Sequence, residues 1–334
     1  MNAKFNKLIL FIATGLIIMA CNPEKSSSSG DVESTTPDFQ ISLAQWSLHR
    51  KYFGDIESRG GFDWFLKTLR ESPDDAIAPG QDPMNFPEDA SKYGVNSIEL
   101  VNTFYFGKVD DQAYWIKFKE KCEEFGVNVG LIMCDLLGDL GDSDPKARNT
   151  SVEKHYKWVD LAKFLGAHTI RVNAAGKGTA DEVSINAIEG LTKLGKYGKQ
   201  QGINIVVENH GGYSSDGKWL ANVIKTVGMD NVGTLPDFGN FCIENGVNGC
   251  VNEYDRYMGI EELMPYAKAV SAKSLVFNGE GDEPNIDFYR IMKIVKASGF
   301  KGHVGIEYEG NELSEDEGIK KTIALLEKAF KQID

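Results

Sequence analysis

Three carboxylate side chains stand at the ends of predicted strands. Glu208 closes the apolar run "INIVV", Asp237 follows "NVGTLP" and Glu307 follows "HVGI". Each alone is more typical of a solvated loop residue or a salt-bridge partner. Three carboxylates at one level of a semi-enclosed site would repel one another and lose solvation, and a divalent cation removes both penalties. The pattern therefore favours a metal site formed by Glu208, Asp237 and Glu307.

Other polar residues stand near the same strand ends. Alternate residues of a strand point to the same face, so His210 should face inward with Glu208. On the same argument, Ser271 and Lys273 share one face of "AVSAKSLVF". Arg171 could bind ligand hydroxyls or pair with a carboxylate. Glu99 and Asp135 are further candidates to line the site.

The elements that must carry these residues alternate regularly. Short β-branched runs are separated by amphipathic helical stretches, and glycine often stands between helix and strand, as in "KYGVN" and "KQQGIN". Glycine is favoured just after a helix C-terminus. Repeated strand–helix alternation indicates parallel strands, and eight such units close most simply into an α/β fold of the (β/α)8 TIM-barrel type. The alternative is an open doubly wound sheet, but no GxGxxG follows the first strand. The predicted strands are "FQISLAQ", "NSIELVN", "NVGLIMC", "HTIRVNA", "NIVVENH", "NVGTLPD", "AVSAKSLVF" and "HVGIEYE".

Two long stretches interrupt this alternation. Residues 59–86, between the first and second predicted strands, should contain an extra helix. Residues 242–259 are predicted to form a long loop. Both follow strand C-termini, the face on which barrels build their active sites. Cys242 and Cys250 in the second stretch could form a disulfide or remain free thiols.

The N-terminal segment has the pattern of a targeting sequence. Lys4 and Lys7 precede the apolar run "LILFIATGLIIMA", which ends at Cys21. We predict a signal peptide over residues 1–20, a lipidated flexible tether over 21–38 and a single barrel domain over 39–334. Lipidation of Cys21 would make the chain a membrane-anchored lipoprotein of the bacterial cell envelope, attached through its lipid alone. The alternative is an ordinary signal peptide with an incidental cysteine.

The overall charge limits the partners. The net charge is −13, whereas a nucleic-acid-binding protein needs a basic face. We therefore expect no nucleic-acid partner, and a small molecule as the ligand of the site.

Three motifs together resemble a known family. "VVENHGG", "PDFGNF" and "GIEYEG" are similar to the xylose isomerase-like TIM barrels of the sugar-phosphate isomerase/epimerase superfamily, over about residues 39–334. The resemblance implies that Glu208, Asp237 and Glu307 bind one divalent metal together with a histidine of the seventh strand. Ser271 stands where that histidine is usual. His210 could lean across, Ser271 could bind through its hydroxyl, or water could fill the position.

The resemblance also implies an activity. Mn²⁺ or Mg²⁺ suits a carboxylate-rich site best, and Zn²⁺ is possible. We expect a sugar isomerase or epimerase in which Glu208 and Glu307 transfer a proton next to a keto-sugar carbonyl. One alternative is a lyase or dehydratase acting on oxidised sugars with the same site. Another is a non-catalytic carbohydrate-binding lipoprotein on a degenerate barrel, which the missing histidine supports and the three carboxylates oppose. Candidate substrate contacts or extra ligands are His210, Ser271, Lys273, Asn240, Trp46 and Arg171.

Overall fold

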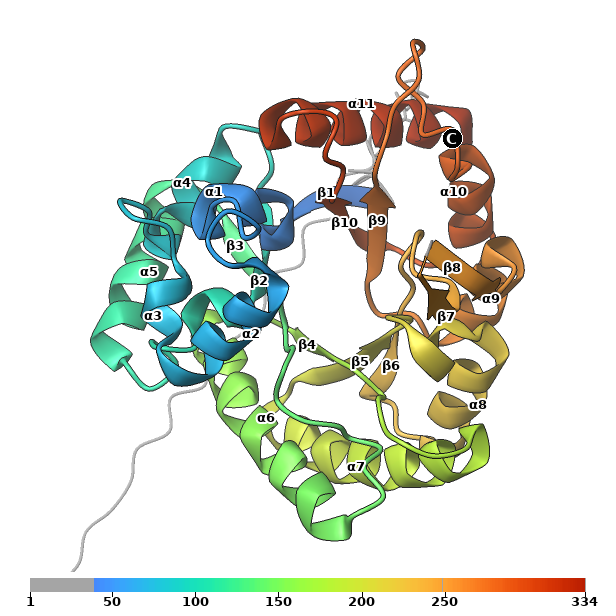
Figure 1. Ribbon diagram of the computed structural model, residues 1–334. Coiled ribbons are helices and arrows are strands. Elements are labelled where there is room, and N and C mark those ends of the chain that lie inside the picture. The colour runs from blue at the N-terminus through green and yellow to red at the C-terminus, as the bar shows by residue number, and fades with distance from the viewer. Residues whose placement is uncertain (1–38, 248, 334) are drawn as a thin grey trace, which may run out of the picture. The chain divides into compact units, whose positions relative to one another are not determined.

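The computed structural model describes residues 39–247 and 249–333, so the predicted signal peptide, tether and lipidated Cys21 lie outside the described residues. Eight parallel strands form one sheet that curves into a barrel (Figure 1). All eight predicted strands are present, and the (β/α)8 prediction is confirmed. The strands are β1 (Phe39–Ala44), β2 (Ser97–Val101), β3 (Asn128–Met133), β4 (Thr169–Val172), β5 (Asn204–Glu208), β6 (Val232–Leu235), β9 (Val270–Ser274) and β10 (Gly302–Tyr308).

The sheet is continuous except at one seam. The strand order is β6-β5-β4-β3-β2-β1-β10-β9, which leaves β6 and β9 as the two edges. Two isolated parallel bridges, Thr234–Ala267 and Asp237–Ser271, connect these edges. The second bridge joins two residues that the sequence analysis assigned to the site, so the barrel closes at the site itself.

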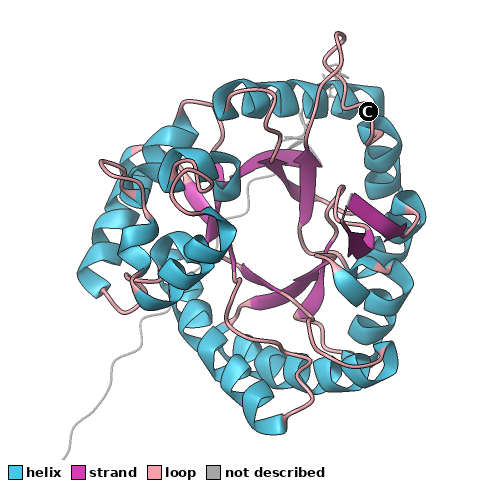
Figure 2. Ribbon diagram, viewed as in Figure 1, coloured by secondary structure: helices cyan, strands magenta, loops and turns pink. Residues whose placement is uncertain are grey.

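Helices cover the outside of the barrel, as Figure 2 shows. Gly202, at the end of α7, has a left-handed backbone (φ 76°), as the glycine pattern predicted. No helix within the described residues is both long and apolar enough to cross a membrane. The helices after β2 are α5 (Gln112–Glu124), α6 (Pro145–Leu165), α7 (Ala180–Gln201), α8 (Gly217–Val227), α9 (Arg256–Leu263), α10 (Phe288–Ala297) and α11 (Glu315–Ile333).

The segment between β1 and β2 contains several helices, where the sequence predicted one. The longest, α2, is amphipathic and buries Phe65 and Leu69 against the rest of the molecule. The shorter ones begin or end at prolines and glycines that limit their length. The helices are α1 (His49–Phe53), α2 (Gly61–Glu71), α3 (Pro73–Ala76) and α4 (Phe86–Ser91).

The long loop predicted after β6 is instead a β-hairpin. Strands β7 (Cys242–Gly246) and β8 (Gly249–Glu253) pair in antiparallel fashion. A disulfide between Cys242 and Cys250 links them, which settles the question that the sequence left open. The hairpin strands are largely exposed and have no apolar alternation, so no hydrophobic pattern indicated strands here.

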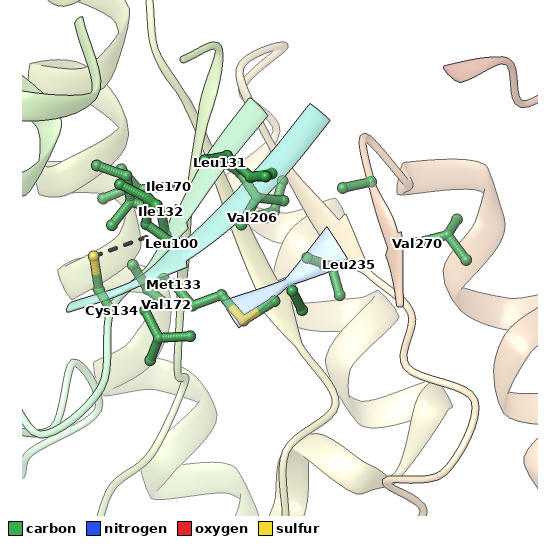
Figure 3. Packing of buried hydrophobic residues seen from close by; sticks show 14 of the residues in the cluster. Leu100, Leu131, Ile132, Met133, Cys134, Ile170, Val172, Val206, Leu235 and Val270 are labelled. Atoms are coloured by element: carbon green, nitrogen blue, oxygen red, sulfur yellow. Dashed lines mark hydrogen bonds between the residues drawn. The ribbon is translucent and has the colours of Figure 1, made fainter. Parts of the chain in front are cut away.

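Apolar side chains fill the space between the strands and the helices. Figure 3 shows Leu100, Ile132 and Ile170 packed together in this layer. All three are at most 1% exposed. Parallel strands covered by helices are buried on both faces, which explains their continuous β-branched runs. Polar residues inside the barrel are therefore exceptions, and they concentrate at the site.

Candidate active site

Glu208, Asp237 and Glu307 form an acidic cluster at the C-terminal ends of the strands. One carboxylate oxygen of each lies within 4.8 Å of those of the other two. Their exposed fractions are 2%, 0% and 4%. Within the described residues this is the one group of three or more acidic, histidine or cysteine side chains close enough to share an ion. The structure thus brings together the three residues that the sequence predicted as ligands.

Asp237 is held by backbone groups of its own loop. Its Oδ1 accepts hydrogen bonds from the backbone N–H groups of Gly239 and Asn240, at 2.7 and 2.8 Å. Its Oδ2 accepts one from the Ser271 hydroxyl at 2.7 Å. The Asn209 amide connects the β5 and β6 ends, since its Oδ1 accepts from the Asp237 N–H and its Nδ2 donates to the Asp237 carbonyl. No role was predicted for Asn209, although its position between Glu208 and His210 could have indicated one at the site.

Glu208 lies between an amide and a guanidinium. Asn240 Nδ2 donates to Glu208 Oε1 at 3.0 Å, and Arg171 Nε lies 2.7 Å from Glu208 Oε2. Arg171 also pairs with the partly exposed Asp135 through Nη1, so it bridges two carboxylates, as one of its two predicted roles required. Glu208 Oε2 has no hydrogen bond of good geometry within the described residues. Its contact with the Arg171 guanidinium is therefore an ion pair without hydrogen-bond geometry.

Lys273 does not neutralise the acidic cluster by direct contact. Its ammonium lies 2.8 Å from Glu309 Oε2 and donates to Asn240 Oδ1 at 3.0 Å.

Burial raises the pKa of Asp237 to about 6, with the Glu208 charge adding to the effect and Lys273 opposing it. Burial and the nearby Glu309 raise the pKa of Glu307 well above its usual range. A divalent cation would stabilise the ionised cluster, so these residues fit one, and oxygen donors suit Mg²⁺ or Mn²⁺.

Ser271 occupies the position of the missing histidine. Its hydroxyl lies 2.7 Å from Asp237 Oδ2 and 3.4 Å from Glu307 Oε2, so it links two members of the acidic cluster. His210 is not part of the group whose ligand atoms lie within 4.8 Å. The structure therefore places Ser271 closer than His210 to a ligand position.

A cavity of about 620 Å³ opens above the acidic cluster. Glu307, Lys273, His210 and Arg171 line it, and Trp46 forms part of its wall with its other ring face stacked on His49. Of the candidate contacts, Asn240 and Ser271 do not line the cavity. They hold the carboxylates from behind. A polar ligand in this cavity would contact Glu307 directly and cover the rest of the cluster.

The family follows from this barrel and from a direct match. Residues 87–329 match the model of the xylose isomerase-like TIM barrel family. The chain belongs to the xylose isomerase-like TIM barrel family. This confirms the resemblance drawn from the three motifs. No curated protein is significantly similar to the chain.

Solved structures of this xylose isomerase-like fold are similar to the chain at low identity. A D-tagatose 3-epimerase-like protein is 14% identical, with 88% of this chain and 100% of that chain covered and a TM-score of 0.63. A xylose isomerase-like TIM barrel protein from Mycobacterium smegmatis, in complex with magnesium, is 15% identical (88% and 98% covered, TM-score 0.62). The 3-keto-D-glucoside 4-epimerase of E. coli is 13% identical (75% and 97% covered, TM-score 0.59). At these identities the likeness shows the fold.

A fourth carboxyl group lies deeper in this xylose isomerase-like barrel. Glu99 is 3% exposed, and the Ser42 hydroxyl donates to its Oε1 at 2.5 Å. Its Oε2 has no hydrogen-bond partner within the described residues. Gly305 makes room for it, since a Cβ at that position would lie 2.4 Å from Glu99 Oε1. Glu99 does not line the main cavity, unlike Asp135, the other acidic candidate of the sequence analysis.

Replacing Glu99 with glutamine should stabilise the protein at alkaline pH. Burial, with a contribution from the Glu208 charge, raises the pKa of Glu99 from 4.5 to about 7. The folded state therefore retains a proton that the unfolded state loses, and the free energy of unfolding falls as pH rises from about 4.5 to 7. Glu99→Gln should be more stable than wild type at pH 8 by roughly 3 kcal/mol, and equal at pH 4. Urea denaturation of metal-free protein across this range tests it.

The exposed Glu327 on α11 provides the control. Glu327→Gln should follow the wild-type pH dependence. A Glu99→Gln variant with the same pH dependence as wild type would show that Glu99 is ionised in the fold.

Proposed function

We propose that the protein is a metal-dependent sugar isomerase or epimerase that transfers a proton next to the carbonyl of a keto sugar. One observation carries the proposal: three buried carboxylates place oxygens within 4.8 Å of one another beneath a cavity of about 620 Å³. Similar structures include a 3-epimerase-like protein and a 4-epimerase of a keto-glucoside, which supports this class of chemistry.

The residues have distinct roles in this proposal. Glu208, Asp237 and Glu307 would hold a divalent ion, which would supply Lewis-acid polarisation of the sugar carbonyl and so make the neighbouring C–H more acidic. Glu307 lines the cavity. Glu208, on the strand three places away around the barrel, does not line it but places a carboxylate oxygen within 4.8 Å of one of Glu307, and in this proposal one carboxylate removes the proton and the other returns it. Asp237 is fully buried beneath them and serves as a ligand only. Lys273, His210 and Arg171 line the cavity and orient the sugar oxygens.

The experiment is solvent deuterium exchange into a panel of keto sugars. In the presence of protein loaded with Mn²⁺, Mg²⁺ or Zn²⁺, a substrate sugar should incorporate deuterium from D₂O at the carbon next to its carbonyl. Addition of a chelator should stop this exchange. Product analysis distinguishes an isomerase or epimerase from a lyase or dehydratase, which would release a leaving group. Absence of exchange across the panel with every metal would exclude the proposal.

The Ser271 hydroxyl favours a second candidate function. It hydrogen-bonds Asp237 and lies 3.4 Å from Glu307, which are contacts that hold two carboxylates together without an ion. A non-catalytic carbohydrate-binding protein would show sugar affinity that does not change on metal removal. The same protein samples, titrated with sugar before and after chelation, discriminate the two candidates.

Membrane attachment through Cys21 is a separate prediction that concerns residues outside the described part. The Lys-flanked apolar run that ends in "IMAC" motivates it. Replacing Cys21 with serine should move the protein from the membrane fraction to the soluble fraction of a bacterial host. Identical fractionation of Cys21→Ser and wild type would exclude the lipid anchor. On this prediction the substrate is met in the cell envelope, which favours an unphosphorylated sugar.

A further inference from the structure

Several large apolar side chains line the cavity above the acidic cluster, and the proposed proton transfer does not use them. We call these residues the apolar wall: Trp46, Phe62, Leu66, Leu69 and Leu136. Phe62 is 58% exposed and Leu136 is 45% exposed, although both are large apolar side chains. Apolar side chains exposed inside a concave site are typical of a surface that a ligand covers.

Leu136 is held in the apolar wall by an unfavourable backbone conformation. Its φ of 59° makes it the one residue other than glycine with positive φ within the described residues. A left-handed backbone is disfavoured for a leucine, and such outliers cluster at functional sites. The loop after β3 thus keeps a large apolar side chain at the mouth of the cavity, where glycine or asparagine would adopt the backbone with less strain.

Polar side chains also line the cavity, and some of them have unused hydrogen-bonding atoms. Thr103 Oγ1 and Asn173 Oδ1 are buried without a hydrogen-bond partner in the described part of the chain. Both residues line the cavity, near Arg171 and Lys273. Buried polar atoms without partners are costly, so a ligand with hydroxyl groups is expected to satisfy them. The sugar ring therefore belongs beside these polar side chains, next to the acidic cluster.

We infer that the substrate is a keto glycoside whose aglycone is an apolar ring, and that the aglycone lies against the apolar wall. The inference rests on the proposed function and specifies its substrate class. Leu66, Leu69 and Leu136 offer no side-chain hydrogen-bonding groups. The polar side chains of α2 and of the loop after β3 that line the cavity are Arg70, Asp135 and Asp139, and Asp135 is already paired with Arg171. Most of the surface of a second hydroxylated sugar ring would therefore lose solvation there without compensation. A free keto sugar would leave the apolar wall exposed. A volume of about 620 Å³ is suited to a ligand larger than one sugar ring.

The test uses three 3-keto-D-glucosides that differ only in the aglycone: methyl, phenyl and glucose. Deuterium exchange should proceed with a kcat/KM about tenfold higher for the phenyl glucoside than for the methyl glucoside. Calorimetric titration of chelator-treated protein should show the same order of affinity, because the apolar wall needs no ion. A preference for the disaccharide, or equal values for methyl and phenyl, would overturn the inference.

Two variants connect the preference to the apolar wall. Phe62→Ser and Leu136→Asn should each bring the phenyl-to-methyl ratio close to one, and asparagine tolerates the left-handed backbone at position 136. Ile185→Ser is the matched control, because Ile185 is 69% exposed on α7 and does not line the cavity. It should keep the wild-type ratio. A ratio that persists in both wall variants would also overturn the inference.

The outcomes separate this inference from the proposed function. Exchange that is equally fast with every aglycone would leave the proposed function standing and exclude the apolar aglycone. Exchange absent from these three compounds and from the whole keto-sugar panel would exclude the proposed function, while the calorimetric preference for phenyl over methyl would still support the aglycone site.

Discussion

Glutamine at position 307 is expected to lower the rate of deuterium exchange into a keto sugar by roughly 10²–10⁴-fold, the usual contribution of general acid–base catalysis. Glu307 lines the cavity and is the member of the acidic cluster that a bound sugar would contact directly. Glutamine keeps the size of the side chain and its ability to accept a hydrogen bond, so sugar affinity should fall less than the rate. Glu208→Gln should have a loss of the same order, since the proposal gives the two carboxylates opposite roles in one proton transfer.

Metal content must be measured in the same samples, because both residues are also proposed ligands. Exchange is therefore measured at saturating metal, where the site is occupied in every variant. Any rate loss that remains then reports the proton-transfer role rather than loss of the ion. Glu327→Gln, on the outer helix α11, should exchange at the wild-type rate. Exchange that continues undiminished in both Glu208→Gln and Glu307→Gln would exclude the two-carboxylate mechanism.

The second large effect is expected at Asp237. Asp237→Asn should weaken divalent-metal binding by at least about 100-fold, since changes even behind the ligands of a metal site cost 10–100-fold. The fold should remain, because Asn Oδ1 can still accept from the N–H groups of Gly239 and Asn240, and its amide can donate to the Ser271 hydroxyl. The metal content measured by elemental analysis should fall from about one ion per chain to almost none. The metal-dependent rise in Tm should disappear with it.

Asp181→Asn, at an exposed position in the first turn of α7, is the control and should bind metal as wild type does. Unchanged metal stoichiometry in Asp237→Asn would show that the acidic cluster is not the metal site. It would leave the carbohydrate-binding alternative as the better account of the cavity.

Much of this barrel could be predicted because its signals are local. Strands buried on both faces have continuous apolar runs, and a glycine such as Gly202 marks the point where a helix ends. With the strands assigned, the two-residue period placed Glu208 and Glu307 inside the barrel. The acidic cluster followed from parallel strands ending at one edge.

The unpredicted features depend on tertiary contacts. The β7–β8 hairpin is exposed, so no apolar period indicated it, and its disulfide could not be chosen over free thiols from spacing alone. The apolar wall brings together α2 and the loop at Leu136, which are separated by more than sixty residues in the printed sequence. The pairing of Arg171 with both Asp135 and Glu208 could not be predicted from the sequence, because it depends on where those two carboxylates lie.

The seam between β6 and β9 gives the acidic cluster a second consequence. Few backbone hydrogen bonds cross this seam in the described structure. The Phe238 N–H donates to the Ser271 carbonyl, the Ser271 N–H to the Pro236 carbonyl and the Lys268 N–H to the Thr234 carbonyl, and the Ser271 hydroxyl adds its bond to Asp237. Regions with few hydrogen bonds are where proteins open locally. Asp237 lies on one side of the seam and Glu307 on the other, so opening it would separate two ligands. An ion that binds both would stabilise the closed seam. By linkage, anything that favours closure of the seam would raise the affinity for the ion, and anything that opens the seam would lower it.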